Sequence, residues 1–462
     1  MGIDMDRDSF LRLLEAPLAR LTEGFVGLPE YASPLDSSAH REAMGVVLDE
    51  VAVRMADNYP YFHPLYAGQM LKPPHPVARA AYALAMTVNP NNHALDGGRA
   101  SSAMEVEAVA EIARMFGWPR PGEHGFLGHL TSGGTFANLE ALWVAGQLAP
   151  GKRIVAQEHA HYTHERISGV LRLLFAKIAA DTAGRMDLNA LEDELRRGDV
   201  GTVVVTMGTT ALGSVDPLPE ILALRDRYGF RVHLDAAYGA YFRLIADDLH
   251  EPARLAFQAM AEADSIVVDP HKHGLQPYGC GCVLFRDAAV GRFYKHDSPY
   301  TYFTSGKLHL GEISLECSRA GAAAVALWAT QRLMPLVAGG EFARGLLAGR
   351  TAALELDRRL RVDDRFEPTA AGPELDIVVW QVAGDSVETR SGRARQIFDN
   401  CVKFNLHLAL VQLPEAIFTA KSAVHAASVT CLRSVLMKPE HAEWLGAIWE
   451  RLSQATDRAL EE

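Results

Sequence analysis

In this 462-residue chain, a lysine and an aspartate each follow an apolar segment, at positions where both residue types could do chemistry. Lys272 follows the run 265–268 in the sequence Asp-Pro-His-Lys, and Asp235 follows the run 230–234. A lysine at the end of a buried strand is costly to desolvate unless it is paired, neutral or converted to an imine. An aspartate at a strand end can cap a helix, or it can pair with a protonated ring nitrogen. A lysine that faces water remains the alternative at position 272.

A glycine-rich turn is the third element, because Ser132-Gly-Gly-Thr135 lies between the apolar run 127–131 and a helical pattern. Such a turn presents free backbone N–H groups and a helix dipole to a phosphate. Its spacing matches neither the dinucleotide-binding fingerprint nor the P-loop, and it suits a single phosphate ester. Many helices begin in this way, so the turn is weak evidence by itself.

Two further residues complete the candidate site. His161 follows another apolar run and could stack on an aromatic ring, while Thr209 closes the run 202–207. The alternatives are a surface histidine and a threonine in an ordinary turn. All five elements follow strands that the pattern predicts to be parallel, and open α/β sheets bind ligands at the carboxyl ends of such strands. Together they predict pyridoxal phosphate, which a lysine binds as an imine and a carboxylate keeps protonated at its ring nitrogen.

Short apolar runs alternate with helical patterns in the middle of the chain. This alternation predicts an α/β fold with a mainly parallel central sheet that helices cover on both faces. The predicted strands are 127–131, 153–157, 202–207, 230–234, 265–268 and 282–285, and the predicted helices are 136–148, 164–174, 218–228 and 316–333. A capping box, Ser102-Ala-Met-Glu105, predicts the start of another helix.

Changes in the residue pattern along the chain predict three structural units. Residues 1–95 are expected to form an N-terminal arm for dimerisation, 96–335 a large cofactor-binding domain, and 336–462 a smaller C-terminal α+β domain. The elements expected in the smaller domain are a helix over 341–360, strands near 377–382, 406–412 and 428–432, and a terminal helix from about residue 440.

The composition excludes several classes of protein. A net charge of −12 argues against a nucleic-acid or anionic-membrane partner. The five cysteines show no zinc spacing or disulfide framework, so neither a metal nor disulfides are expected. The longest run of small apolar residues, 320–329, is about half the ~20 residues that span a bilayer. With no secretory signal visible, a cytoplasmic location is expected.

The chain resembles the group II pyridoxal-phosphate-dependent amino acid decarboxylases, which include the glutamate, aromatic amino acid and archaeal tyrosine/aspartate enzymes. The matching pieces are Ser-Gly-Gly-Thr at 132–135, Ala-His at 160–161, Gly-Thr-Thr at 208–210, Asp-Ala-Ala at 235–237, Asp-Pro-His-Lys at 269–272 and Ser-Leu-Glu-Cys-Ser-Arg at 314–319. The resemblance covers roughly residues 55–335 and continues more loosely to the end. It implies a fold type I enzyme of the aspartate aminotransferase superfamily that converts an L-amino acid to its primary amine and CO₂.

The resemblance also implies a role for each matching residue. Lys272 would bind the cofactor as an imine, and Asp235 would pair with the pyridine nitrogen. His161 would stack on one face of the ring, with Ala237 on the other. The residues implied to hold the phosphate or to lie beside the ring are Gly134, Thr135, His271 and Thr209.

The family members are homodimers whose active sites lie at the subunit interface. The resemblance therefore implies that the arm of one subunit shapes the substrate pocket of the other, through Asn92, His93 and Leu95. A loop tyrosine would return a proton to the substrate; Tyr294, Tyr300 and Tyr302 qualify, and Tyr302 is preferred.

Alternatives remain open. On the same cofactor the reaction could be that of a carbon–carbon lyase, an aldehyde synthase or an aminotransferase, and Arg433 could then clamp an α-carboxylate. An ion pair at the surface or between domains is the favoured interpretation of Arg433. A pyridoxal-binding regulatory protein without turnover is the remaining alternative. Glu312 and Glu316 would favour a basic substrate if they faced the pocket, although acids are also common at a helix N-terminus.

Overall fold

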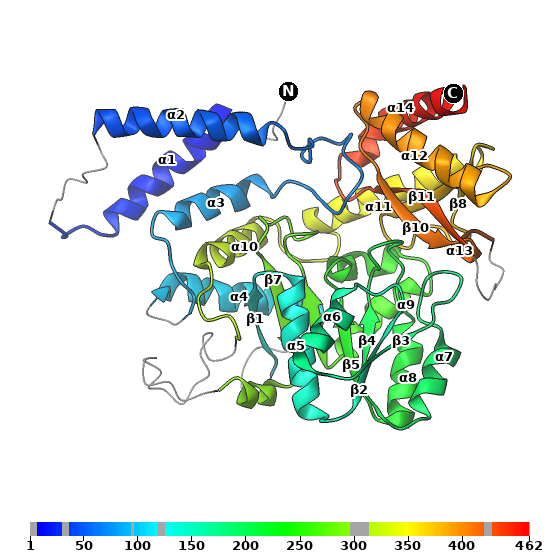
Figure 1. Cartoon of the computed structure of the whole chain (residues 1–462). Coiled ribbons are helices and arrows are strands. Elements are labelled where there is room, and N and C mark those ends of the chain that lie inside the picture. The colour runs from blue at the N-terminus through cyan, green and yellow to red at the C-terminus, as the bar shows by residue number, and fades with distance from the viewer. Residues whose placement is uncertain are drawn as a thin grey trace.

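The larger sheet of this protein has seven strands in the order β1-β7-β6-β5-β4-β2-β3 (Figure 1). The computed structural model describes residues 7–29, 37–93, 97–118, 125–295, 314–419 and 427–461. The strands are β1 (Leu127–Thr131), β2 (Arg153–Gln157), β3 (Phe175–Ile178), β4 (Val200–Thr206), β5 (Arg231–Asp235), β6 (Ser265–Val268) and β7 (Gly281–Phe285). Neighbours from β6 to β3 pair in parallel, and β7 alone runs against the two strands beside it. The predicted mainly parallel sheet is thus confirmed.

Both faces of this sheet are buried, which explains why its strands are continuous apolar runs rather than alternating ones. In β4, Val203 and Val205 belong to the core on one face, while Val204 belongs to the core on the other. Successive side chains of a strand point to opposite faces, so two cores require an apolar residue at every position.

Helices form the covering layers. In chain order they are α1 (Arg7–Glu23), α2 (Ser38–Met55), α3 (Pro76–Met86), α4 (Arg99–Met115), α5 (Gly134–Leu148), α6 (Thr163–Leu171), α7 (Leu188–Leu195), α8 (Leu218–Tyr228), α9 (Ala253–Gln258), α10 (Gly321–Leu333), α11 (Glu341–Arg361), α12 (Val387–Lys403), α13 (Ala416–Thr419) and α14 (His441–Glu461). Helices α5 and α6 pack on one face of the larger sheet, whereas α4, α8 and α10 contribute to the core on the other.

The edge strand β3 is absent from the sequence prediction, which extended the helix before it to residue 174. The helix α6 ends at Leu171 because Arg172 adopts the left-handed conformation, with φ of 57°. Glycine usually occupies that position and would have marked the end of the helix. The short strand that follows contains the exposed Lys177, so its apolar pattern is weak.

The predicted capping box is wrong. Helix α4 begins at Arg99, and both Ser102 and Glu105 are buried within it. The carboxylate of Glu105 accepts hydrogen bonds from the backbone N–H of Leu130 and from Arg319 rather than from its own helix end. A capping pattern and a buried polar contact use the same residue types, so sequence alone does not separate them.

The predicted helix 316–333 is also too long. Helix α10 begins at Gly321, after a turn in which Glu316 accepts a hydrogen bond from the backbone N–H of Ser132 at 2.9 Å. This hydrogen bond joins the segment before α10 to the glycine-rich turn at residues 132–135. The expected helix N-terminus at Glu316 is therefore not formed.

A second sheet of four antiparallel strands, in the order β10-β11-β9-β8, lies above the larger sheet in Figure 1. Its strands are β8 (Phe366–Pro368), β9 (Ile377–Val382), β10 (Ala409–Pro414) and β11 (Ser428–Val435). Helices α11, α12 and α14 pack on it and share its core. Helix α12 and strand β8 are missing from the sequence prediction, whereas β9 has the predicted bounds.

The segment before residue 95 contacts both sheet units. Helix α3 packs against α10. Further back in the chain, the backbone N–H of Ala67 donates to the carbonyl of His407 at 2.9 Å, and its carbonyl accepts the N–H of Val435 at 2.7 Å. Part of the predicted arm therefore completes the smaller unit, while the three domain boundaries stay a prediction. None of the helices in the described ranges combines the length and the apolar character that a bilayer crossing requires.

Candidate active site

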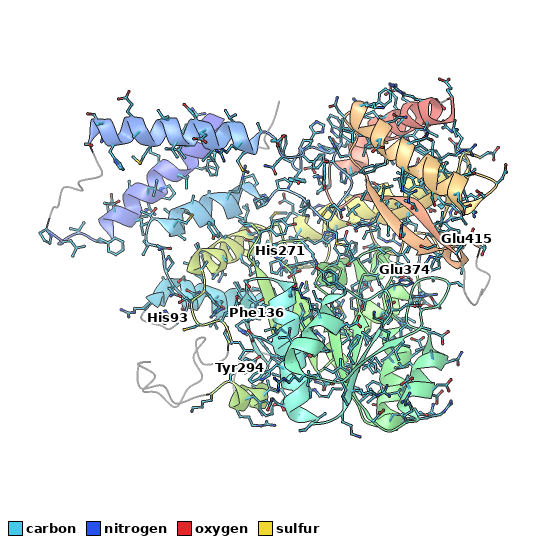
Figure 2. The ribbon with its side chains drawn as sticks, in the orientation of Figure 1. His93, Phe136, His271, Tyr294, Glu374 and Glu415 are labelled. Atoms are coloured by element: carbon cyan, nitrogen blue, oxygen red, sulfur yellow. The ribbon has the colours of Figure 1, made fainter. Side chains whose placement is uncertain are left out.

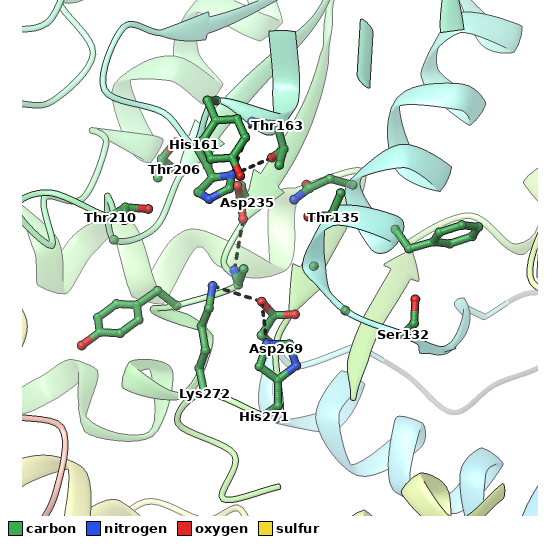
Figure 3. Close-up of a pocket in the computed structure, with 18 residues that line it drawn as sticks. Ser132, Thr135, His161, Thr163, Thr206, Thr210, Asp235, Asp269, His271 and Lys272 are labelled. Carbon is green, nitrogen blue, oxygen red and sulfur yellow. Dashed lines mark hydrogen bonds and ion pairs between the residues drawn. The ribbon is translucent and has the colours of Figure 1, made fainter. Parts of the chain in front are cut away.

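The strand ends and turns singled out in the sequence meet in one cavity of about 520 Å³ (Figure 3). Binding sites for small ligands typically have volumes of roughly 300–1,000 Å³. The residues that line it are Ser132, Gly133, Gly134, Thr135, Phe136, Asn138, His161, Tyr162, Thr163, Thr206, Gly208, Thr210, Asp235, Ala237, Tyr238, Asp269, His271 and Lys272. Within the described part of the chain, no group of three or more metal-ligating side chains forms.

Lys272 reaches into this cavity from the turn after β6. Its Nζ lies 3.0 Å from Oδ2 of Asp269, three residues earlier in the chain. The Asp269 carboxylate is buried, and its second oxygen has no hydrogen-bond partner. The alternative of a lysine that faces open water does not hold, because the amine is paired inside a cavity.

Asp235, at the end of β5, lies in the wall of the cavity and is almost fully buried. Its Oδ2 is 2.7 Å from Nε2 of His164, and its Oδ1 accepts the backbone N–H of Ala237 at 3.2 Å. Burial by itself raises the pKa of Asp235, but the hydrogen bond from His164 and the influence of Lys272 outweigh it and hold this pKa well below its ordinary value. The group is thus an ionised carboxylate at neutral pH.

The glycine-rich turn leads from β1 into α5, which begins at Gly134. The first N–H groups of a helix have no partner within it, so this end of α5 offers donors and a positive dipole end to an anion. His271, labelled in Figure 2, lies at the same end of the cavity, because a Cβ added at Gly133 of the turn would lie 3.5 Å from its Cε1. Its Nδ1 donates to the carbonyl of Cys280 at 2.8 Å, so a neutral ring has an unprotonated Nε2. A role for His271 in holding a phosphate therefore needs the doubly protonated ring.

Gly134 has no room for a side chain, which yields a prediction. A Cβ at this position would lie 2.7 Å from Oδ2 of Asp269, the oxygen that pairs with Lys272. Gly134→Ala should therefore weaken pyridoxal phosphate binding by about tenfold or more, since the loss of one well-placed charged contact costs about 1.5–3 kcal/mol. Titration of the apoprotein with pyridoxal phosphate measures the change. Gly169→Ala in α6 is the matched control, because an added Cβ there meets nothing within 4 Å; equal affinities for the two variants would contradict the assignment.

His161 lines the cavity at the start of α6, and its Nδ1 lies 2.8 Å from the hydroxyl of Thr163. Burial lowers the pKa of His161, so its ring is neutral at pH 7 and has a flat face that an aromatic ligand could contact. Ala237 lines the same cavity. Thr209 does not line it: its side chain is fully buried and accepts the N–H of Ser214 at 3.1 Å, while the adjacent Thr210 does line it.

The predicted substrate residues Asn92 and His93 do not line this cavity. Asn92 is buried and donates to Glu105 at 2.6 Å. Leu95, Tyr300, Tyr302 and Glu312 lie outside the described residues. Tyr294 is described and packs against Trp143, with ring centroids 4.9 Å apart, outside the set of residues that line the cavity.

Arg433 lies on β11 and is buried. Its Nη1 donates to Gln69 at 3.2 Å, and its Nε and Nη2 have no hydrogen-bond partner. Among the described residues no carboxylate forms an ion pair with it, so neither the surface nor the interdomain ion pair expected from the sequence is present. Tyr238, which lines the cavity, is close enough to influence the pKa of Arg433, although burial, which lowers it, dominates.

Two functional candidates escaped the sequence interpretation. His164, which contacts Asp235, stands three residues after His161, one helical turn away. Asp269 belongs to the same four-residue sequence as Lys272 and contacts it across a tight turn. The spacing of three residues was the available signal in both cases. It was not decisive because both pairs lie in or next to turns, where spacing alone does not fix which side chains meet.

This fold and this site define a pyridoxal-phosphate-dependent enzyme of fold type I. The residues present fit the cofactor, because a lysine, an ionised carboxylate and a helix N-terminus converge on one cavity of suitable size. The family described as "Pyridoxal-dependent decarboxylase conserved domain" matches residues 58–381. The chain belongs to this family, and it is a carboxy-lyase that decarboxylates an L-amino acid with pyridoxal phosphate.

Individual relatives agree with this placement. The L-tyrosine decarboxylase of Enterococcus faecium is 29% identical, over 75% of this chain and 71% of the relative. A probable L-tyrosine/L-aspartate decarboxylase of Methanothermobacter thermautotrophicus is 28% identical, over 68% of this chain and 82% of the relative. Among solved structures, the TDC of Oryza sativa with PLP and tryptamine has a TM-score of 0.77 at 17% identity, covering 99% of both chains, which shows the shared fold.

Proposed function

We propose that this enzyme acts on L-tyrosine, with its cofactor bound covalently to Lys272. The observation that supports the residue roles is the convergence of Lys272, Asp235 and the 132–135 turn on one cavity. Support for the substrate comes from the relative in Enterococcus faecium, which is an L-tyrosine decarboxylase.

The residues of the site have two kinds of role: some stabilise charge, and others position the cofactor. When bound, pyridoxal phosphate supplies an electron-accepting ring that weakens the bond to the α-carboxylate of an attached amino acid. Asp235 would hold a proton at the ring nitrogen of the cofactor, since its ionised carboxylate can only accept hydrogen bonds. Asp269 receives the ammonium group of Lys272 whenever the lysine is free, as the 3.0 Å contact indicates. The neutral ring of His161 would cover one face of the cofactor ring, and Ala237 would leave room on the other.

A proton must return to Cα after CO₂ leaves, and we propose Tyr302 as its donor. Of the other two tyrosines considered, Tyr294 is buried between Trp143 and His129. Its position in the core disfavours Tyr294 and supports a donor from further along the chain.

We further propose that the enzyme is a homodimer in which the arm of one subunit completes the substrate pocket of the other. Helix α2 buries none of its residues, and together with α1 it lies at the edge of the molecule (Figure 1). Its exposed apolar residues are Met44, Val46, Val47, Leu48, Val51, Val53 and Met55. So much exposed apolar surface is typical of a protein interface. In such a dimer, the pocket would receive His93 and Leu95 from the neighbouring arm, while Asn92, buried against Glu105 of its own subunit, would hold that segment in place.

L-aspartate is the second candidate substrate. Arg433 has two buried nitrogens without partners and lies close to Tyr238 in the cavity wall. An unpaired buried guanidinium is costly, and a carboxylate from a ligand would satisfy it.

The test is a screen of the standard L-amino acids with the holoenzyme, without any keto acid, that detects CO₂ and identifies the amine. We expect CO₂ and tyramine from L-tyrosine. CO₂ and β-alanine from L-aspartate alone would replace the first candidate with the second. Formation of a keto acid or an aldehyde in place of a primary amine would contradict both.

A further inference from the structure

Two histidines lie near the start of helix α6: His161 precedes the helix by two residues and lines the cavity, whereas His164 lies within the helix and does not. His161 lies in the wall, whereas His164, one turn later, is 1% exposed and lies behind it. The polar contact that His164 makes is with Asp235, at 2.7 Å between Nε2 and Oδ2. The carboxylate of Asp235 therefore has the cavity on one side and a histidine on the other.

The contact determines which nitrogen carries the proton. An ionised carboxylate accepts and cannot donate, so Nε2 of His164 must be the donor. The second oxygen of Asp235 accepts the backbone N–H of Ala237 at 3.2 Å. With a donor on each oxygen, the carboxylate cannot rotate without losing a hydrogen bond.

A purely structural role explains His164 poorly. Its Nδ1 is buried and has no hydrogen-bond partner, which costs free energy that an apolar side chain in the same place would avoid. His233 provides the contrast within this core, because its two nitrogens contact Ser265 and Asn138, each at 2.8 Å. His164 keeps an unsatisfied atom and gains the single contact to Asp235.

We infer that His164 is a positioning residue that aims the carboxylate of Asp235 at the ring nitrogen of the cofactor and keeps it ionised. This inference rests on the proposed role of Asp235. The hydrogen bond also accounts for the lowered pKa of Asp235, in spite of the burial that would raise it. His164 is buried and does not line the cavity, so this residue would act on turnover through Asp235 and not on substrate binding.

The experiment measures the proton on the ring nitrogen directly. Wild-type protein and the variants His164→Leu, His164→Gln and Asp235→Asn are reconstituted with pyridoxal phosphate that carries ¹⁵N in its ring, and the ¹⁵N chemical shift is recorded. We expect the shift to move toward the value of an unprotonated ring in His164→Leu and in Asp235→Asn. Glutamine can place an amide donor near the position of Nε2, so His164→Gln should retain most of the wild-type shift.

Turnover provides the second measurement. We expect kcat of His164→Leu to fall about tenfold to a hundredfold with KM nearly unchanged, the range for a hydrogen bond to a charged group. Glutamine should restore most of this loss. His159→Leu, on the same loop but outside the cavity lining, should match the wild type. Should the leucine variant not fold, His164→Asn, whose amide is too short to reach Asp235, replaces it.

Two results would overturn the inference, and they differ from each other. If Asp235→Asn moves the ¹⁵N shift and His164→Leu does not, His164 has no influence on the ring. If neither variant moves it, Asp235 is not the partner of the ring nitrogen, and the proposed role of Asp235 fails as well.

Discussion

Replacing Lys272 with alanine is expected to abolish the visible absorbance of the bound cofactor and to lower turnover at least about a thousandfold. Losses of this size follow when an enzyme loses the residue that forms a covalent bond in catalysis. Among the described residues, Lys272 is the lysine that lines the cavity, with its amine 3.0 Å from Asp269. Alanine leaves the phosphate turn and Asp235 in place, so pyridoxal phosphate should still bind, but without a covalent bond.

Reduction with borohydride tests the assignment of Lys272 by a measurement that does not depend on enzyme activity. In the wild type it should fix the cofactor to the peptide that contains Lys272, and mass spectrometry locates the modified residue. Lys152→Ala, which removes an exposed lysine bonded to the carbonyl of Gly198, is the control and should label normally. Burial lowers the pKa of Lys72 to about 8, which makes it a reactive competitor; a label on Lys72 instead would refute the assignment.

Asp235→Asn is expected to lower kcat by about a hundredfold to a thousandfold, the cost of removing one preorganised electrostatic group from an active site. Asparagine has nearly the same shape but cannot hold a proton on the ring nitrogen. It also leaves His164 without an ionised partner. The loss should appear in kcat, because the ring nitrogen matters most when electrons flow into the ring. A tenfold loss or less would show that Asp235 has no such role.

The pH dependence follows from the direction of the Asp235 shift. Its folded-state pKa lies below the ordinary value of 3.8, so its contribution to stability is present above that value and is lost only as the pH falls through the lower, folded-state pKa. Protonation of Asp235 therefore cannot cause a loss of activity between pH 5 and 7. A kcat profile of Asp235→Asn with the same acid limb as the wild type, at lower amplitude, is the expected result.

Much of the larger sheet was predictable because its strands are apolar on both faces and short. The bounds of β1, β2 and β6 agree with the sequence prediction, as do those of α8. The errors lie where the chain departs from the usual signals. Helix α6 ends at a left-handed arginine instead of a glycine, and the polar pair Ser102 and Glu105 is buried within α4 instead of capping it.

The sequence by itself determined the cofactor and the residues most important to it. Lys272, Asp235 and the 132–135 turn each follow an apolar run, and the ends of parallel strands meet at one edge of a sheet, so their convergence follows from local pattern and topology. All three lie within residues 58–381, the part of the chain that the decarboxylase family matches.

Only the tertiary structure decided which side chains contact those residues. The pairing of Asp269 with Lys272 and of His164 with Asp235 depends on side-chain directions at a packed junction, where a difference of a few ångströms separates a contact from none. Likewise, Thr209 and Thr210 are adjacent in the sequence, yet only Thr210 reaches the cavity, because the hydroxyl of Thr209 closes its own turn. The chemistry-bearing residue types are a property of the chain, whereas the partners that tune them are set by how its elements pack.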